Sequence, residues 1–193
     1  MPNMPPWGAR DNRIGNNPLV MAVPRGDGPV VLDMALSQFS YGRLESTVEQ
    51  GGDLPVPGGH DESGRLTTDA AAILRSRRLL PIGYWKGSAL AIVLDLLGVM
   101  LSAGRSTCEV EPDPEKESGL SQVFLAIDLS RATDSDRLAL RVGAVLEDLV
   151  AAEPDENGIL VRYPGQRVLR ARAENLRLGV PVDARVWRHL SSL

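Results

Sequence analysis

The hydrophobic pattern of the chain centres on one long apolar run that follows a loop rich in glycine and aromatic residues. The loop is Gly83-Tyr84-Trp85-Lys86-Gly87-Ser88, and nearly every position from 89 to 101 is apolar. A helix that is apolar nearly all round is typical of a buried helix. The pattern therefore predicts a buried central helix over about 87–102, ending near Gly104. The run 89–101 has the length of a core helix and looks too short to span a bilayer.

Shorter apolar segments predict strands. Leu19 to Val23 is expected to be a buried strand, and residues 30–32 its hairpin partner, with Asp33 at the end of that partner. Residues 122–128 are apolar through their middle, which predicts a strand at the centre of a sheet. A further short strand is expected at 159–161.

Capping residues mark the helices between these strands. The stretch Thr67-Thr68-Asp69 suits the cap of a helix over about 69–76, while Pro164 and Gly179 suit the start and the end of another. Polar, glycine-rich composition predicts long loops at 49–66 and 109–121. The alternation of strands and helices predicts the α/β class, a mixed sheet with helices. Other helices are expected over about 35–46, from 133–136 onward, and at the C-terminus around Trp187 and His189.

Composition narrows the possible partners and compartments. The chain has 193 residues and a net charge of −4, which argues against nucleic acid or an anionic membrane as its main partner. Its one cysteine, Cys108, cannot form an internal disulfide, so a reducing compartment fits. The start, Met1 to Trp7, has neither the basic nor the apolar region of a signal peptide. Metal-ligand spacings of Cys and His are missing from the sequence, so we expect no metal site.

Two predicted helix starts carry a cation beside a glycine. Lys86 opens the central helix, and Gly165-Gln166-Arg167 opens the helix after Pro164. The helix dipole favours anions at such a start, so together they would suit a diphosphate. The alternative is that Lys86 is simply solvated and that Arg167 begins a solvated basic face. The short motif at 26–28 does not continue into a dinucleotide fingerprint, which excludes a standard Rossmann fold.

Five titratable residues are weaker candidates for chemistry. Asp33 could cap a helix, which its spacing favours, or accept hydrogen bonds from ribose hydroxyls. Asp95, the one acidic residue in the apolar run, is more readily explained by a structural pairing than by catalysis. His60-Asp61 could act as an acid–base pair or be solvated, and His189 has no neighbouring carboxylate.

Several motifs, in the same order, resemble the malate/L-lactate dehydrogenase family that lacks a Rossmann fold. The resemblance covers essentially the whole chain. The motifs are Ile14-Gly15-Asn16-Asn17-Pro18, Ala22-Val23-Pro24, Leu32-Asp33-Met34-Ala35, Phe39-Ser40-Tyr41-Gly42, Leu80 to Gly87, and Pro164-Gly165.

This resemblance implies a homodimeric, cytoplasmic oxidoreductase that passes a hydride between NAD(P)H and a 2-keto or 2-hydroxy acid. It implies an NAD(P)-binding domain over 1–163 and a C-terminal helical segment over 164–193. The implied cofactor contacts are Pro29, Val30, Val31, Leu32, Asp33, Met34, Ala35, Trp85, Lys86, Gly165, Gln166 and Arg167.

Two departures from the family pattern limit what carries over. Gln166 stands where an acidic residue is expected, which could favour the 2′-phosphate of NADP(H), so NAD(H) and NADP(H) both stay open. The family's catalytic histidine lies in an N-terminal segment that this sequence does not match, so no catalytic residue carries over. The chain could therefore be part of a 2-keto-acid reductase, or a non-catalytic remnant that binds a dinucleotide or only dimerises. Without that segment, apolar surface on the sheet or the central helix should be exposed.

Overall fold

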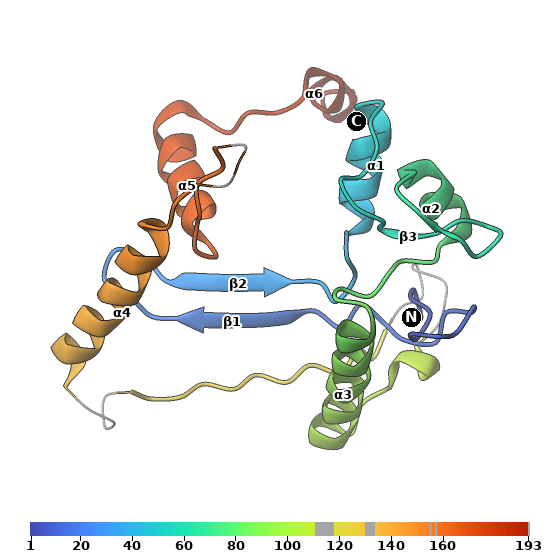
Figure 1. Ribbon diagram of the computed structural model, residues 1–193, viewed down its shortest axis with the longest axis horizontal. Coiled ribbons are helices and arrows are strands. Elements are labelled where there is room, and N and C mark those ends of the chain that lie inside the picture. The colour runs from blue at the N-terminus through green and yellow to red at the C-terminus, as the bar shows by residue number, and fades with distance from the viewer. Residues whose placement is uncertain (111–117, 130–133, 155, 157, 193) are drawn as a thin grey trace. The chain divides into compact units, whose positions relative to one another are not determined.

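The computed structural model describes residues 1–110, 118–129, 134–154, 156 and 158–192, which form two compact units (Figure 1). Unit 1 comprises Met1–Leu19 and Met34–Ala126, and unit 2 comprises Val20–Asp33 and Ile127–Leu193. The family-based division at residue 163 stays a prediction. The elements are β1 (Leu19–Val23), β2 (Val30–Met34), α1 (Tyr41–Glu49), β3 (Gly59–His60), β4 (Leu66–Thr67), α2 (Ala70–Ser76), α3 (Trp85–Ser102), η1 (Thr107–Glu109), α4 (Ser135–Val150), α5 (Gln166–Leu178) and α6 (Ala184–Leu190).

The mixture of helices and small sheets confirms the expected α/β class, but the described strands do not form one mixed sheet. They form two sheets of two strands, β1–β2 and β3–β4. The predicted hairpin is confirmed, since β1 and β2 are neighbours and run in opposite directions (Figure 1). The expected burial of β1 is wrong: Val20, Met21 and Val23 are all about half exposed.

Unit 1 holds a compact apolar core. Met4, Leu36, Leu44 and Ile73 are fully buried there, and they come from four separate segments of unit 1. Packing of these side chains, rather than extensive strand pairing, is therefore the main source of stability in unit 1.

Side-chain caps fix where the helices of this core begin. The Asp69 carboxylate accepts from the backbone N–H of Ala72 at 3.0 Å, which confirms the predicted cap of α2. Helix α1 begins at Tyr41 instead of 35, because Ser40 supplies its cap by accepting from the N–H of Arg43. The expected loop 49–66 contains β3 and the start of β4, which pair as a short hairpin.

Helix α3 confirms the predicted central helix in extent, but its expected burial is wrong. Only Gly87, Ser88 and Ala91 are buried, while Met100 is 78% exposed. The helix ends at Ser102, and the capping residue Ala103 has a positive φ. Among the described helices, α3 alone is long and apolar enough to cross a bilayer by length and composition, so its length does not exclude a span.

Two predicted strands are absent from the described structure. Residues 122–128, expected at the centre of a sheet, lie outside any strand that the structure describes, and Phe124 is 88% exposed. Residues 159–161 are likewise exposed and outside any strand. In the expected loop 109–121, Glu109 accepts from the N–H and hydroxyl of Ser106, whereas 111–117 lie outside the described residues.

Unit 2 contains α4, α5 and α6 together with most of the β1–β2 hairpin. Helix α4 begins at Ser135, within the start that the sequence predicts at 133–136, and Asp134 caps it by accepting from the N–H of Asp136 at 2.9 Å. Helix α5 lies between Gly165 and Gly179, both with positive φ, which confirms the predicted start and end.

We expect Ile73→Ala to lower the free energy of unfolding by about 2–5 kcal/mol, because it leaves a cavity in the core of unit 1. Ile73 is fully buried and packs against Gly58 and Gly59. Ile73→Val, which removes one methylene, should cost about 0.5–1.5 kcal/mol. Urea denaturation of the two variants measures both losses. Equal effects of the two substitutions would contradict this packing.

Candidate cofactor site

In unit 2 the start of α5 lies directly against β2. The backbone N–H of Val31 donates to the carbonyl oxygen of Pro164 at 3.3 Å. Gly165 has a φ of +85°, and a Cβ there would lie 3.1 Å from the Val31 nitrogen. Gly28 makes a similar close approach, since a Cβ there would lie 2.9 Å from the Leu169 side chain. The two glycines thus allow the hairpin and the helix start to meet.

This junction forms one wall of an open pocket of about 640 Å³. The pocket brings together residues about 130 positions apart, among them five of the twelve predicted cofactor contacts. Its lining residues are Pro29, Val31, Leu32, Asp33, Arg162, Tyr163, Pro164, Gly165, Val168 and Leu169.

Asp33 is an exposed carboxylate at this pocket. It lies within β2, eight residues before α1 begins, and Ser40 caps that helix. The helix-cap interpretation that spacing favours is therefore wrong, as is the expectation that Asp33 ends the strand. No described residue donates a hydrogen bond to its carboxylate, so both oxygens are open to a donor from a ligand.

Gln166 and Arg167 line a second open pocket of about 670 Å³ on the same unit. The Oε1 atom of Gln166 is buried and accepts no hydrogen bond from a described residue. Arg167 is exposed and has no ion-pair partner among the described residues. Arg162 borders both pockets. The start of α5 therefore has the unpaired Oε1 of Gln166 and the guanidinium groups of Arg162 and Arg167 near it.

Two residues of this site escaped the sequence analysis. The Arg25 guanidinium donates to the Tyr163 hydroxyl at 3.1 Å and lies 5.8 Å from the centre of its ring. This contact joins the turn of the β1–β2 hairpin to Tyr163, the residue that precedes Pro164. The Pro164-Gly165 pair was the available signal for this region, but nothing in the spacing connects it to Arg25.

The start of α3 belongs to unit 1. Lys86 is exposed, with its Nζ atom 5.8 Å from the centre of the Trp85 ring. The backbone N–H of Lys86 donates to the Gly83 carbonyl, whereas the N–H groups of Trp85 and Gly87 find no acceptor among the described residues. Gly87 is buried, so the free N–H of the exposed Trp85, beside the unpaired Lys86, is the donor that this helix start offers to an anion.

Tyr84 holds this helix start in an unusual backbone conformation. Its φ of 58° and ψ of −114° lie outside the common regions for a residue with a side chain, which costs of order 1–3 kcal/mol. Its ring packs edge-on against Trp7 at 5.3 Å, and the N–H of Trp7 donates to the Ser88 hydroxyl at 2.9 Å. The sequence does not predict these contacts of Trp7 with the start of α3, since a positive φ at tyrosine has no local sequence signature.

The remaining predicted contacts divide between the units. Val30 begins β2 in unit 2, while Met34 belongs to unit 1 and packs against its core, and Ala35 follows directly. Lys86 and Arg167 likewise belong to different units, so their use of one diphosphate stays a prediction.

Asp95 has a structural role, as the sequence analysis favoured. Its Oδ1 atom accepts from the backbone N–H and the hydroxyl of Thr107, each at 2.9 Å. Next to it, the Asn17 amide donates to the Ala91 carbonyl at 2.8 Å. These bonds tie η1 and the N-terminal segment to the inner face of α3.

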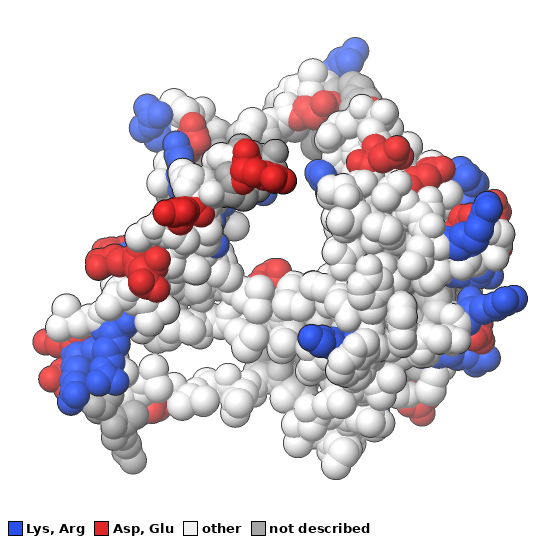
Figure 2. Space-filling view, in the orientation of Figure 1, with Lys and Arg blue, Asp and Glu red and all other residues white. Residues whose placement is uncertain are grey.

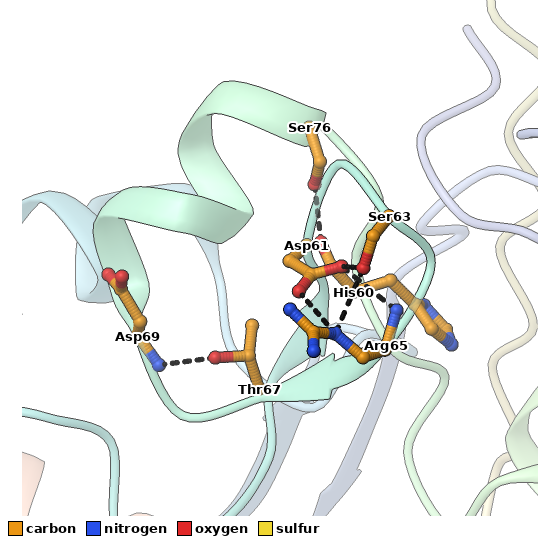
Figure 3. Close-up of polar contacts among 7 residues, drawn as sticks. All are labelled: His60, Asp61, Ser63, Arg65, Thr67, Asp69 and Ser76. Carbon is orange, nitrogen blue, oxygen red and sulfur yellow. Dashed lines mark hydrogen bonds and ion pairs between the residues drawn. The ribbon is translucent and has the colours of Figure 1, made fainter.

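His60 and Asp61 do not form an acid–base pair. Figure 3 shows the Asp61 carboxylate turned toward Ser63 and Arg65, where it accepts from the Ser63 hydroxyl at 2.6 Å and the Arg65 N–H at 2.9 Å. Burial, reinforced by Arg78, lowers the pKa of His60, and its Nδ1 atom has no hydrogen-bond partner among the described residues. The side chain of His189 lies outside the described part of the structure.

Asp61 should titrate well below an ordinary aspartate. The Ser63 hydroxyl, and then the N–H and guanidinium of Arg65, lower its pKa from 3.8 to about 2. Because the folded-state pKa is the lower one, the stability this turn contributes should persist above pH 4 and be lost as the pH falls toward 2. In carboxylate NMR titrations we expect Ser63→Ala to raise the pKa and Ser46→Ala to leave it unchanged. A midpoint near 3.8 in the unchanged chain would refute the assignment.

Comparison with known proteins places the chain in a family. The family model of malate/L-lactate dehydrogenases matches residues 1–191. The 2,3-diketo-L-gulonate reductase of Citrobacter koseri is 41% identical over 191 residues, covering 98% of this chain and 57% of the reductase. The structure of Δ1-piperideine-2-carboxylate reductase from Pseudomonas syringae is similar with a TM-score of 0.78 and 28% identity, covering 100% of this chain and 57% of that one.

A malate dehydrogenase from Pyrococcus horikoshii shares the fold, with a TM-score of 0.83 at 24% identity over 99% of this chain and 53% of that one. The chain thus spans little more than half the length of the curated relatives that it matches. Because the family match runs through almost every residue, the resemblance seen in the sequence motifs is confirmed: the chain belongs to the malate/L-lactate dehydrogenase family.

Proposed function

We propose that this chain supplies the dinucleotide-binding part of an NAD(P)H-dependent oxidoreductase that reduces a 2-keto acid, most like 2,3-diketo-L-gulonate reductase. The observation that carries the proposal is the junction of β2 with the start of α5. There the open carboxylate of Asp33, the close backbone approach at Gly165 and the orphan Oε1 of Gln166 occur in one unit.

The chemistry of these groups fits a dinucleotide. A carboxylate without a donor, such as Asp33, can accept hydrogen bonds from ribose hydroxyls. A helix start with an exposed arginine, as at Arg167, attracts phosphate oxygens. A side chain at position 165 would fill the space beside Val31, so glycine keeps the backbone accessible there.

The start of α3 would provide a second phosphate contact. Lys86 is exposed and unpaired, and the Trp85 and Gly87 N–H groups are free of described acceptors. Trp85 is 60% exposed beside the lysine, so its ring is available to stack on a planar group of the cofactor. In this proposal the start of α3 is a phosphate contact in its own right within unit 1.

A bound nicotinamide would supply the hydride that reduces the keto carbon. The residues of this chain bind and orient the cofactor, and we assign none of them to proton transfer. His60 lies in unit 1 without a carboxylate partner, and its lowered pKa leaves it uncharged at neutral pH. We therefore expect little turnover from this chain alone.

Cofactor choice rests on position 166 in this proposal. Gln166 brings no negative charge beside Arg167, so a 2′-phosphate would meet the arginine without repulsion. NADP(H) should accordingly bind at least as well as NAD(H). As in the family resemblance, we propose a homodimer in the cytoplasm that acts on a small 2-keto or 2-hydroxy acid.

A non-catalytic chain that binds dinucleotide without reducing a substrate is the second candidate. The observation that favours it is that His60 and Asp61 form no acid–base pair in the described structure, since the Asp61 carboxylate accepts from Ser63 and Arg65 instead. Assays of 2,3-diketo-L-gulonate, pyruvate and oxaloacetate reduction separate the two. Turnover on any of them supports the enzyme, whereas cofactor binding with no turnover on all three supports the non-catalytic chain.

Calorimetric titration of the purified chain with NADH and NADPH tests the shared part of the proposal. We expect saturable binding at one site per chain, and weaker binding for Lys86→Ala. As a control, Lys86→Arg keeps the charge and should retain most of the affinity. Absence of binding for both nucleotides would exclude the cofactor role of both helix starts.

A further inference from the structure

Residues Gly83 to Lys86 form a tight turn at the start of α3. The backbone N–H of Lys86 donates to the Gly83 carbonyl at 3.2 Å, and Tyr84 has a φ of 58° and a ψ of −114°. The second residue of a type II′ turn has angles of about +60° and −120°, and glycine is usual there because φ is positive. Tyr84 therefore occupies a position that glycine would fill without strain.

Contacts of Trp7 hold this turn from outside the helix. The Trp7 ring lies edge-on against the Tyr84 ring, with 5.3 Å between the ring centres and 64° between the planes. Its backbone N–H donates at 2.9 Å to the hydroxyl of Ser88, a buried residue 81 positions along the chain. A strained conformation persists only where its surroundings fix it, and Trp7 supplies two such contacts within unit 1.

Burial does not explain why a tyrosine stands at this position. Tyr84 is 46% exposed and Trp7 is 51% exposed, so their contact removes only part of each ring from water. The fold does not require the ring pair, because glycine at position 84 would form the same turn. Strained residues cluster at ligand sites, where the strain is part of how the site is arranged. The turn is therefore a candidate for a ligand contact.

The turn directs a backbone donor and a cation toward solvent. Because the peptide unit is planar, the ψ of Tyr84 sets the direction of the Trp85 N–H, which has no acceptor among the described residues. The Nζ atom of Lys86 lies 5.8 Å from the centre of the Trp85 ring. Figure 2 shows that the visible surface over α3 is largely without charged side chains, and Lys86 has no ion-pair partner in the part of the chain that the structure describes. Such a pair of groups suits a phosphate.

We propose that Trp7 is a positioning residue for a phosphate-bearing ligand. Through the Tyr84 ring and the Ser88 hydroxyl, it holds the turn in the conformation that directs the Trp85 N–H toward a phosphate beside Lys86. This role rests on the proposed phosphate contact at the start of α3. Without the Trp7 ring, Tyr84 is free to relax toward a negative φ, and the Trp85 N–H then changes direction.

A purely structural role for Trp7 predicts a different result. A tryptophan that only stabilises unit 1 would, when replaced, lower the free energy of unfolding and leave the affinity of the folded chain unchanged. A positioning residue changes the affinity, because groups that are already in place lose less entropy on binding. The affinity of the folded chain therefore separates the two roles.

Calorimetric titration of the full chain with NADPH tests the proposal. We expect Trp7→Ala to weaken binding about tenfold, because the turn is no longer pre-organised. Trp7→Phe keeps a ring against Tyr84 and should bind within about threefold of the unchanged chain. Trp187→Ala removes another exposed tryptophan, in α6, and should leave the affinity unchanged.

Tyr84→Gly is a second variant, which forms the turn without strain. We expect its urea midpoint to be no lower than that of the unchanged chain, because the relief of strain offsets the lost ring contact. Its NADPH affinity should nevertheless fall about fivefold, because glycine leaves the turn free to change conformation.

The possible outcomes separate this role from the proposed function. If Trp7→Ala or Tyr84→Gly binds NADPH as tightly as the unchanged chain, the positioning role is overturned and the proposed function stands. Equally weak binding by Trp7→Phe and Trp7→Ala would also overturn it, since the ring would then have no part in the effect. Failure of the unchanged chain to bind NADPH would contradict the proposed function itself, and the positioning role with it.

Discussion

Gly87→Ala should lower the free energy of unfolding of unit 1 by about 3 kcal/mol, at the upper end of the usual cost of overpacking a core. Gly87 lies in the first turn of α3, where a Cβ would come 2.0 Å from the carbonyl oxygen of Ile82. That oxygen belongs to the backbone, so no side-chain rotation relieves the clash. The loop 82–84, which includes the strained Tyr84, must move instead.

A matched control is available in α1. Gly42 is also in the first turn of a helix, but a Cβ there meets nothing within 4 Å. Gly42→Ala should therefore raise stability by about 0.4–1 kcal/mol, because alanine lowers the entropy of the unfolded chain. Urea denaturation followed by circular dichroism measures both. A loss below about 1 kcal/mol for Gly87→Ala would contradict the packing of α3 against residue 82.

Arg167→Ala should weaken NADPH binding by about 10- to 100-fold, since a hydrogen bond to a charged group contributes about 1.5–3 kcal/mol. Arg167 is exposed in the first turn of α5 and lines the pocket that also holds Gln166. We expect a smaller loss for NADH if the arginine contacts the 2′-phosphate. Equal losses for both nucleotides would assign it to the pyrophosphate.

Arg172 provides the control on the same helix. It is exposed but borders neither pocket, so Arg172→Ala should change the affinity for either nucleotide less than twofold. Calorimetric titration at one fixed ionic strength compares the two variants. If both substitutions weaken binding equally, the effect comes from the net charge of α5, and Arg167 has no specific role.

Local capping signals explain what could be predicted of the fold. The cap at Asp69 and the ends of the helix between Pro164 and Gly179 depend on interactions within a few residues, and these two predictions are confirmed. The start of α1 was wrong because two plausible caps, Asp33 and Ser40, lie seven residues apart. Only the structure shows that β2 continues through Asp33.

Apolar composition was a poorer guide to burial. The run in α3 and the segment 122–128 were expected to be buried, yet both are largely exposed. Hydrophobicity indicates that a surface needs a covering, but it does not say whether the same chain provides it.

The sequence could predict which residues belong to the candidate site, but it could not predict the distant contacts that hold them in place. The motifs around Asp33 and Gly165 were recognisable from the family resemblance, and the structure places them at one pocket. The contact of Arg25 with Tyr163 and the positive φ of Tyr84 depend on distant packing, which no sequence spacing encodes.

Amide hydrogen exchange of the full chain with and without saturating NADPH tests the central claim most directly. The proposed site predicts slower amide exchange at 30–35, 85–87 and 165–167, and unchanged exchange in α4 and α6. Bound nucleotide that leaves these three segments unprotected, or that protects α4 or α6 instead, would contradict the claim that the hairpin and the two helix starts hold the dinucleotide.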